Sequence, residues 1–143
     1  MESERAIRRT LALYGPLLDD RRYEDWGGLF VEEAVWAIPG STFEGRQQIV
    51  DGVSAMQPSM AGLVRHFSLA PIVEFDRAGH AFAWTDFFVM ARSDLDSAWE
   101  VASVGRYCDE LVEAGGAWRF SRRVADFGPG ERPAVTFEET PRI

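Results

Sequence analysis

The side chain best suited to acid–base chemistry in this sequence is the imidazole of His66. An unperturbed imidazole titrates near pH 6.5, so it accepts and returns a proton at neutral pH. A histidine satisfied within the core is the alternative interpretation. His80, the other histidine, follows the turn Arg77-Ala78-Gly79 and is expected to be exposed to solvent. His66 is therefore the candidate general base.

Asp86 is a second candidate for acid–base chemistry, because it lies in an aromatic run. Strand alternation places it on the same face as Phe82, Trp84 and Phe88. A carboxylate is costly to bury among aromatic rings unless it is paired or protonated, and a protonated acid suits a general acid. Pairing with Arg106 or another strand arginine is the structural alternative.

Aromatic and basic side chains supply the candidates for substrate binding. Arginine can hold a carboxylate through two parallel hydrogen bonds, although most of these arginines are expected to be solvated or paired with acids. They are Arg65, Arg106, Arg122 and Arg123. Large aromatic side chains lining a cavity would suit a ring-shaped apolar ligand. They are Trp36, Trp84, Phe88 and Trp118.

The residue types that are missing or rare exclude several chemistries. Every basic residue is arginine, and the absence of lysine and asparagine excludes Schiff-base catalysis, a P-loop lysine and N-glycosylation. The single cysteine, Cys108, cannot form an internal disulfide and is expected to be a small buried hydrophobe. With two histidines and no ligand spacing, no metal site is predicted.

Composition and charge indicate one globular domain and oppose polyanionic partners. The 143 residues are 46% hydrophobic and 27% charged, which is ordinary for a folded chain. The net charge of −8 opposes binding to nucleic acid or to anionic membranes. No apolar run is long enough to span a bilayer, and the charged N-terminus is no signal peptide, so we expect a cytoplasmic protein.

Helices are predicted in the first half of the chain and strands in the second. Ser3 can cap a helix that carries an apolar stripe including Tyr14, and Gly15-Pro16 predicts a kink or break near residues 12–16. Further helices are expected over 23–30 and 46–56, with a strand over 34–38 and a turn over 41–45. Long strands are expected over 63–75 (with Pro71 at a bulge or edge), 80–92, 98–113 and 118–127.

This order of elements predicts an α+β fold, with helices gathered on one face of an antiparallel sheet. The short connections favour antiparallel pairing of neighbouring strands. A strongly curved sheet wrapped by the three helices would form a cone that encloses an apolar cavity. We place this single domain at residues 1–127 and a C-terminal tail at 128–143.

Five segments between residues 5 and 125 occur in a recognisable order: Tyr14 with Leu18-Asp19-Asp20 and Trp26-Gly27-Gly28-Leu29-Phe30; Phe43-Glu44-Gly45-Arg46; Arg65-His66-Phe67; Gly105-Arg106-Tyr107-Cys108-Asp109-Glu110-Leu111; and Trp118-Arg119-Phe120-Ser121-Arg122-Arg123. The set resembles SnoaL-like proteins of the nuclear transport factor 2-like superfamily. That superfamily includes scytalone dehydratase, hexachlorocyclohexane dehydrochlorinase, bile acid dehydratases and ketosteroid isomerase. The resemblance implies a conical α+β barrel with an apolar pocket.

The resemblance also implies roles for three residues. Catalytic members use a histidine on the first long strand, an aspartate at the end of the first helix and often a tyrosine on that helix, which correspond to His66, Asp19 and Tyr14. Asp19 would hold the imidazole in one tautomer, and Tyr14 would donate to an oxygen that gains charge. The alternatives are that Asp19 only ends a helix and that Tyr14 bonds a backbone carbonyl. The lysine or second histidine of some members has no equivalent here.

Together these observations predict a lyase of the dehydratase type that needs no cofactor and acts on a small, apolar, cyclic substrate carrying a carbonyl. His66 would be the base, Asp19 its partner, and Tyr14 or Asp86 would assist the leaving group or the enolate. A double-bond isomerase or polyketide cyclase with the same base is the first alternative. A non-catalytic ligand-binding module, or the small structural subunit of a ring-hydroxylating oxygenase, is the second. An exposed, aromatic sheet face predicts a homodimer or homotrimer.

Overall fold

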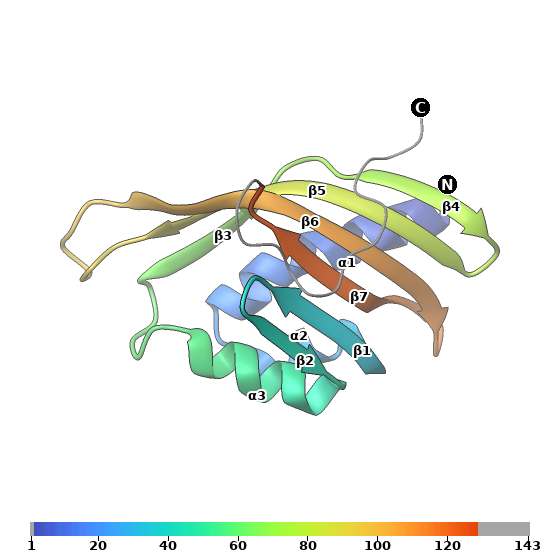
Figure 1. The fold of residues 1–143 in the computed structure, drawn as a ribbon, viewed down its shortest axis with the longest axis horizontal. Helices are drawn as coiled ribbons and strands as arrows, with labels where there is room; N and C mark the ends of the chain where they lie inside the picture. Colours follow the sequence, from blue (N-terminus) through green and yellow to red (C-terminus); the bar gives the residue numbers. More distant parts are fainter. Residues whose placement is uncertain (1, 129–143) are drawn as a thin grey trace.

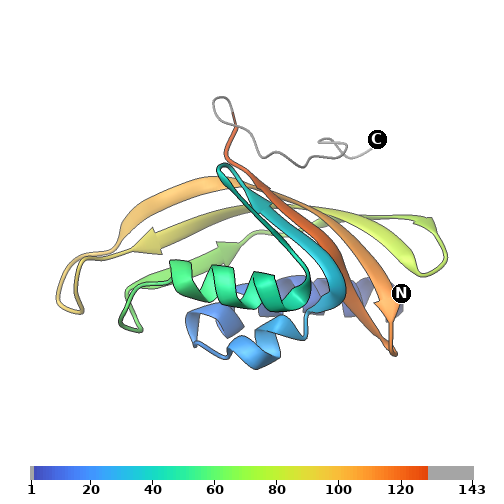
Figure 2. The same ribbon diagram turned by 60° about the horizontal axis from the view of Figure 1, so that its bottom comes forward.

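The computed structural model describes residues 2–128, in which three helices pack on one side of a curved, unclosed sheet (Figures 1 and 2). The predicted α+β class is confirmed. The elements follow in the order α1 Glu2–Asp19, α2 Tyr23–Gly27, β1 Phe30–Ile38, β2 Ser41–Glu44, α3 Arg46–Met56, β3 Val64–Ser68, β4 Ile72–Arg77, β5 His80–Ala91, β6 Glu100–Ala114 and β7 Ala117–Asp126.

The seven strands form one sheet in the order β2-β1-β7-β6-β5-β3, and β4 pairs with β5 beyond the end of β3. Among the described strands every pair is antiparallel except β1 with β7, which run parallel. The expectation of a wholly antiparallel sheet is therefore wrong for this pair. It relied on short connections, whereas α3 and five strands separate β1 from β7 along the chain.

The predicted boundary of α3 is confirmed, and β5 to β7 lie within about two residues of their predicted ranges. The long strand expected over 63–75 is two strands, because Pro71 lies between β3 and β4. The second helix is shorter than expected, since it ends at Gly27, and β1 begins earlier, at Phe30.

Helix α1 continues through Gly15-Pro16, so the predicted break is absent. An interior proline costs a helix about 3 kcal/mol relative to alanine, and glycine costs about 1 kcal/mol. Tertiary packing outweighs this local cost, because the residues on both sides, including Tyr14, Leu17 and Leu18, are buried in the core.

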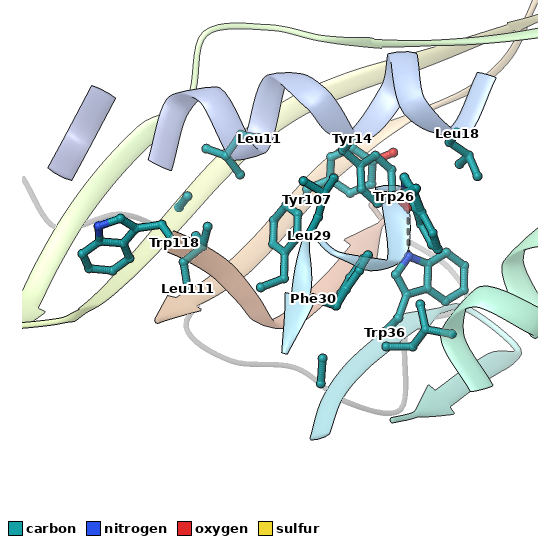
Figure 3. Close-up of a cluster of buried hydrophobic side chains, with 14 of the residues drawn as sticks. Leu11, Tyr14, Leu18, Trp26, Leu29, Phe30, Trp36, Tyr107, Leu111 and Trp118 are labelled. Carbon is teal, nitrogen blue, oxygen red and sulfur yellow. Dashed lines mark hydrogen bonds between the residues drawn. The ribbon is translucent and has the colours of Figure 1, made fainter. Parts of the chain in front are cut away.

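The core lies between α1 and the concave face of the sheet (Figure 3). The Tyr14 ring is at its centre, with ring centroids 5.4 Å from Trp26 and 5.5 Å from Tyr107. Leu11, Leu18, Phe30 and Phe120 belong to the same buried cluster. The apolar stripe predicted for the first helix is thus the surface that α1 packs against the sheet.

The described residues end at Gly128, so the rest of the tail predicted over 128–143 lies outside them. Within residues 2–128, no helix combines the length and apolar character needed to cross a membrane.

Candidate active site

The structure brings His66 and Asp19 into direct contact, although one lies on β3 and the other ends α1. Nδ1 of His66 lies 2.6 Å from Oδ1 of Asp19. The backbone N–H of His66 donates to the second carboxylate oxygen, Oδ2, at 2.8 Å. Both side chains are largely buried, at 14% and 11% exposure. One carboxylate therefore holds the histidine by its ring and by its backbone.

The hydrogen bond from the His66 backbone N–H to Asp19 follows from the position of β3 in the sheet. Within the described residues β3 pairs only with β5, so the backbone groups on its other edge have no strand partner there. Asp19 accepts one of these edge N–H groups. The carboxylate thus satisfies a backbone donor whether or not the ring takes part in chemistry.

The Asp19 carboxylate also selects the tautomer of the His66 ring. A carboxylate beside Nδ1 favours the hydrogen on that nitrogen, which leaves the lone pair of Nε2 free to accept a proton. His66 lines an internal cavity, whereas Asp19 is not among the residues that line it. This is the arrangement of an oriented general base.

The cavity has a volume of about 280 Å³ and opens between α1, the end of α3 and the concave face of the sheet. Most of its wall is apolar, with residues such as Val53, Met56, Phe87, Val89 and Phe127. Its polar side chains are Tyr14, Trp36, Gln57, His66, Ser103 and Tyr107. Among residues 2–128, no arginine or carboxylate lines this cavity. Its size is near the lower end of ligand pockets, about 300 Å³, and its wall suits a small neutral molecule.

Tyr14 presents a hydrogen-bond donor at this cavity. Its hydroxyl oxygen accepts the indole N–H of Trp36 at 2.9 Å (Figure 3). Because that bond uses an acceptor site of the hydroxyl, the O–H hydrogen can be donated to a ligand. The Tyr14 ring meets the His66 ring edge-on, with centroids 6.4 Å apart. A donor and a base thus lie on neighbouring parts of one wall.

A buried ion pair lies next to the rings of Tyr14 and Tyr107. Arg123 on β7 donates from Nε and Nη2 to the two oxygens of Asp109 on β6, both at 2.8 Å, and the side chains are 1% and 0% exposed. Burial raises the pKa of Asp109, while the charge of Arg123 acts against that rise. The guanidinium lies 4.1 Å from the Tyr14 ring centroid and 3.8 Å from that of Tyr107.

Sequence reasoning missed Tyr107 and Asp109 as inward-facing residues. Along β6, Tyr107 and Asp109 alternate with Arg106 and Cys108. Alternation shows that these two sets face opposite sides of the sheet, but it does not show which set faces inward. Arg123 was considered only as one of several strand arginines. Burial of Arg123 depends on an acidic partner on the neighbouring strand. Asp109 is that partner, because it lies directly opposite Arg123 in the register of β6 and β7.

Burial controls the ionisation of both phenols. It raises the pKa of Tyr14 against the opposing effects of Arg123 and the Trp36 hydrogen bond, and it raises the pKa of Tyr107 well above its usual value. Unfolded tyrosines ionise near pH 10. We expect these two hydroxyls to stay protonated in the folded protein beyond that pH, so the free energy of unfolding falls as pH rises above about 10. The absorbance of tyrosinate during a pH titration measures this.

The controls for that titration are Tyr14→Phe and Tyr107→Phe, each of which should remove one late-ionising group. The chain has three tyrosines. Simultaneous ionisation of all three near pH 10 in the folded protein would contradict the expected effect of burial.

Asp86 and Arg106 lie outside the cavity, on the opposite face of the sheet, which corrects their predicted positions. They are direct partners in the register of β5 and β6, with Nε 2.6 Å from Oδ1 and side chains 53% and 47% exposed. The hydrogen bond that Arg106 donates to Asp86 raises the pKa of Arg106. A solvated, paired carboxylate lacks the apolar surroundings on which the general-acid hypothesis depended. The alternative interpretation of Asp86, pairing with Arg106, is confirmed.

Three predicted binding aromatics are also absent from the cavity wall. Trp84 and Phe88 share the outer face with Asp86, because Phe87 is the residue of β5 that points inward. Both faces of β5 carry aromatic rings, so composition could not tell them apart. Trp118 packs edge-on against Phe75 at 5.8 Å, at the far end of the core from Trp36 (Figure 3). Only Trp36 of the four lines the cavity.

His80 is buried at 4% exposure, so the expectation that it is exposed is wrong. Its Nδ1 lies 2.5 Å from Asp76 and its Nε2 lies 2.6 Å from Glu110. The hairpin of β4 and β5 supplies Asp76, and neighbouring β6 supplies Glu110. Across residues 2–128, no three His, Cys, Asp or Glu side chains gather in a way that could hold a metal ion.

The comparisons with known proteins agree with this fold. The model of the SnoaL-like domain matches residues 1–124. No curated protein matches the chain.

Three solved structures illustrate the likeness. An NTF2-like protein with a cystatin-like fold from Novosphingobium aromaticivorans is 24% identical, with a TM-score of 0.78 over 91% of this chain and 84% of that one. A protein provisionally assigned as a scytalone dehydratase, from the same organism, is 21% identical, with a TM-score of 0.78 over 94% and 95%. The beta subunit of a protein provisionally assigned as an aromatic-ring-hydroxylating dioxygenase, also from that organism, is 20% identical, with a TM-score of 0.72 over 94% and 91%. At these identities the likeness establishes the fold.

Proposed function

The chain belongs to the SnoaL-like domain family, and on that premise we propose that it is an enzyme that removes a proton from carbon in a small, mostly apolar, cyclic substrate. The carbon is one acidified by a neighbouring carbonyl. The single observation that carries the proposal is the carboxylate-bound imidazole of His66 in the wall of an apolar cavity. A fold alone would not support a reaction, because this architecture hosts many functions.

In this proposal His66 Nε2 takes the proton, and the electrons of the broken C–H bond move toward the carbonyl. Asp19 stabilises the imidazolium that forms. The Tyr14 hydroxyl donates a hydrogen bond to the carbonyl oxygen as negative charge develops there. Trp36 fixes the direction of that hydroxyl through its N–H.

Elimination of water completes the reaction. A hydroxyl group on the next carbon leaves with its bonding electrons and receives the proton from the His66 imidazolium, so the products are an unsaturated carbonyl compound and water. His66 returns to its neutral form without a further reactant. The likeness to a protein provisionally assigned as a scytalone dehydratase supports elimination. An isomerase or a cyclase would use the same base but would retain every atom.

The wall of the cavity sets the substrate class. Because the described part of the chain places no arginine in the wall, a carboxylate or phosphate ligand would bury its charge there without a cationic partner. The aromatic rings of Trp36, Phe87, Tyr107 and Phe127 suit a flat ring. We infer a neutral compound of one or two rings.

A non-catalytic role is the second candidate, supported by the likeness to a dioxygenase beta subunit. Such a scaffold does not require a histidine in a cavity wall that is held by an aspartate. The two candidates differ in one measurable property, which is proton exchange at carbon.

The test is deuterium incorporation from D₂O into a panel of one- and two-ring cyclic ketones and their β-hydroxy derivatives. We expect exchange at the carbon next to the carbonyl, followed by loss of water from the β-hydroxy members, both measured by mass spectrometry and proton NMR. Exchange with a displaced double bond and no loss of water would identify an isomerase instead. Binding of panel members without any exchange would overturn the catalytic proposal.

A further inference from the structure

Helix α1 and strand β3 approach most closely at Gly15. A Cβ atom added at this position would lie 2.9 Å from the backbone oxygen of His66 and 3.2 Å from its Cβ. Real Cβ atoms almost never approach another atom to under 3.0 Å, and a backbone oxygen cannot rotate away as a side chain does. The contact therefore exists only because residue 15 has no side chain.

The position of Gly15 in α1 relates this contact to the Asp19 carboxylate. Residues four apart in a helix lie one above the other on the same face. Gly15 meets the backbone of His66, and Asp19, one turn later, binds its N–H and its ring. The same helix thus contacts one residue of β3 at two successive turns.

Glycine followed by proline is a poor sequence for the interior of a helix, yet α1 is continuous there. Sequences that break a local rule do so most often where function or close packing requires it. Here the locally unfavourable glycine lies directly opposite the candidate base. Glycine at residue 15 permits the close approach.

We propose that Gly15 is a positioning residue for His66, which brings β3 close enough to α1 for the Asp19 carboxylate to hold the ring in the tautomer that leaves Nε2 free. Its catalytic consequence rests on the function proposed above, but its structural content does not. Gly15 is not among the residues that line the cavity, so it acts through His66 alone.

Gly15→Ala is the variant that tests this role. The added methyl group must move β3 away from α1, which lengthens the 2.6 Å and 2.8 Å contacts with Asp19 together. We expect the His66 amide to exchange with solvent at least about tenfold faster, since its hydrogen bond to a charged acceptor is lost. The ring should also populate the Nε2–H tautomer, read from imidazole nitrogen shifts by NMR.

Two further variants serve as a comparison and as a control. Asp19→Asn should produce one of the two changes, because the single acceptor oxygen of the amide can accept from the His66 ring or from its backbone N–H but not from both. Gly27→Ala is the packing control, since its added Cβ would meet Val50 Cγ2 at 2.7 Å, away from His66. It should leave the exchange of the His66 amide and the tautomer as they are in the wild type.

The proposal is overturned if Gly15→Ala folds and keeps the wild-type tautomer and amide exchange, or if Gly27→Ala changes them equally. The wild-type protein supplies a test that needs no variant, because nuclear Overhauser contacts must join the α-protons of Gly15 to the β-protons of His66. Their absence would also overturn it. None of these measurements uses a substrate, so a failure of the ketone exchange assay would overturn the proposed reaction and leave this result standing.

Discussion

Replacing His66 with alanine is expected to lower the rate of deuterium incorporation by about 10²–10⁴-fold, the usual contribution of a general base. The physical reason is that, within residues 2–128, no other lining residue is a neutral base, since the remaining polar groups of the wall are hydroxyl, amide and indole groups. The rate is measured on whichever ketone of the panel exchanges with the wild-type protein, and the melting temperature is measured alongside it.

His80→Gln is the matched control for that experiment. His80 is also buried and also bound by carboxylates, but it contacts Asp76 and Glu110 and does not line the cavity. Its replacement should lower the melting temperature without removing exchange activity. Full activity in His66→Ala would exclude His66 from the mechanism, even with the contact to Asp19 intact in the wild type.

Asp109→Ala is expected to lower the free energy of unfolding by about 3–5 kcal/mol, the largest stability effect of a single substitution considered for this chain. The substitution leaves the Arg123 guanidinium buried and without its carboxylate, and Nη1 of Arg123 already has no hydrogen-bond partner among residues 2–128. Charge buried in this way costs far more than the lost hydrogen bonds alone. Chemical denaturation followed by circular dichroism measures the change.

The chain contains a matched control for this prediction. Asp86 and Arg106 are also an aspartate and an arginine joined across neighbouring strands, but both are about half exposed. Asp86→Ala should therefore change the free energy of unfolding by no more than about 1 kcal/mol. Equal effects at Asp86 and Asp109 would show that burial does not govern the strength of the inner pair.

A variant with an apolar pair in place of the ion pair also tests whether an unpaired buried charge causes the loss of stability. Replacement of both Asp109 and Arg123 by leucine and methionine removes both buried charges at once. Such exchanges are often neutral or stabilising in other proteins. We expect the double variant to be more stable than Asp109→Ala, and the Tyr14 and Tyr107 rings to lose the cation beside them.

The amino-acid sequence by itself determined the types and order of most elements. The apolar stripe of the first helix, the third helix over 46–56 and the three long strands from residue 80 onward follow from local periodicity, which depends on the residues of each segment alone. The family resemblance pointed to Asp19 and His66, and their contact is present in the structure. These features required no knowledge of which segments lie side by side.

Only the tertiary structure decided which face of the sheet is the inside. Alternation along β5 separates Asp86 from Phe87 but does not say which of the two meets the helices, because both faces carry aromatic rings. For the same reason, alternation did not show that Tyr107, Asp109 and Arg123 are buried on the inner face. The close approach of α1 to β3 at Gly15 depends on two segments far apart in the chain. Such contacts arise from how helices cross a curved sheet, and no local pattern of residues specifies that crossing.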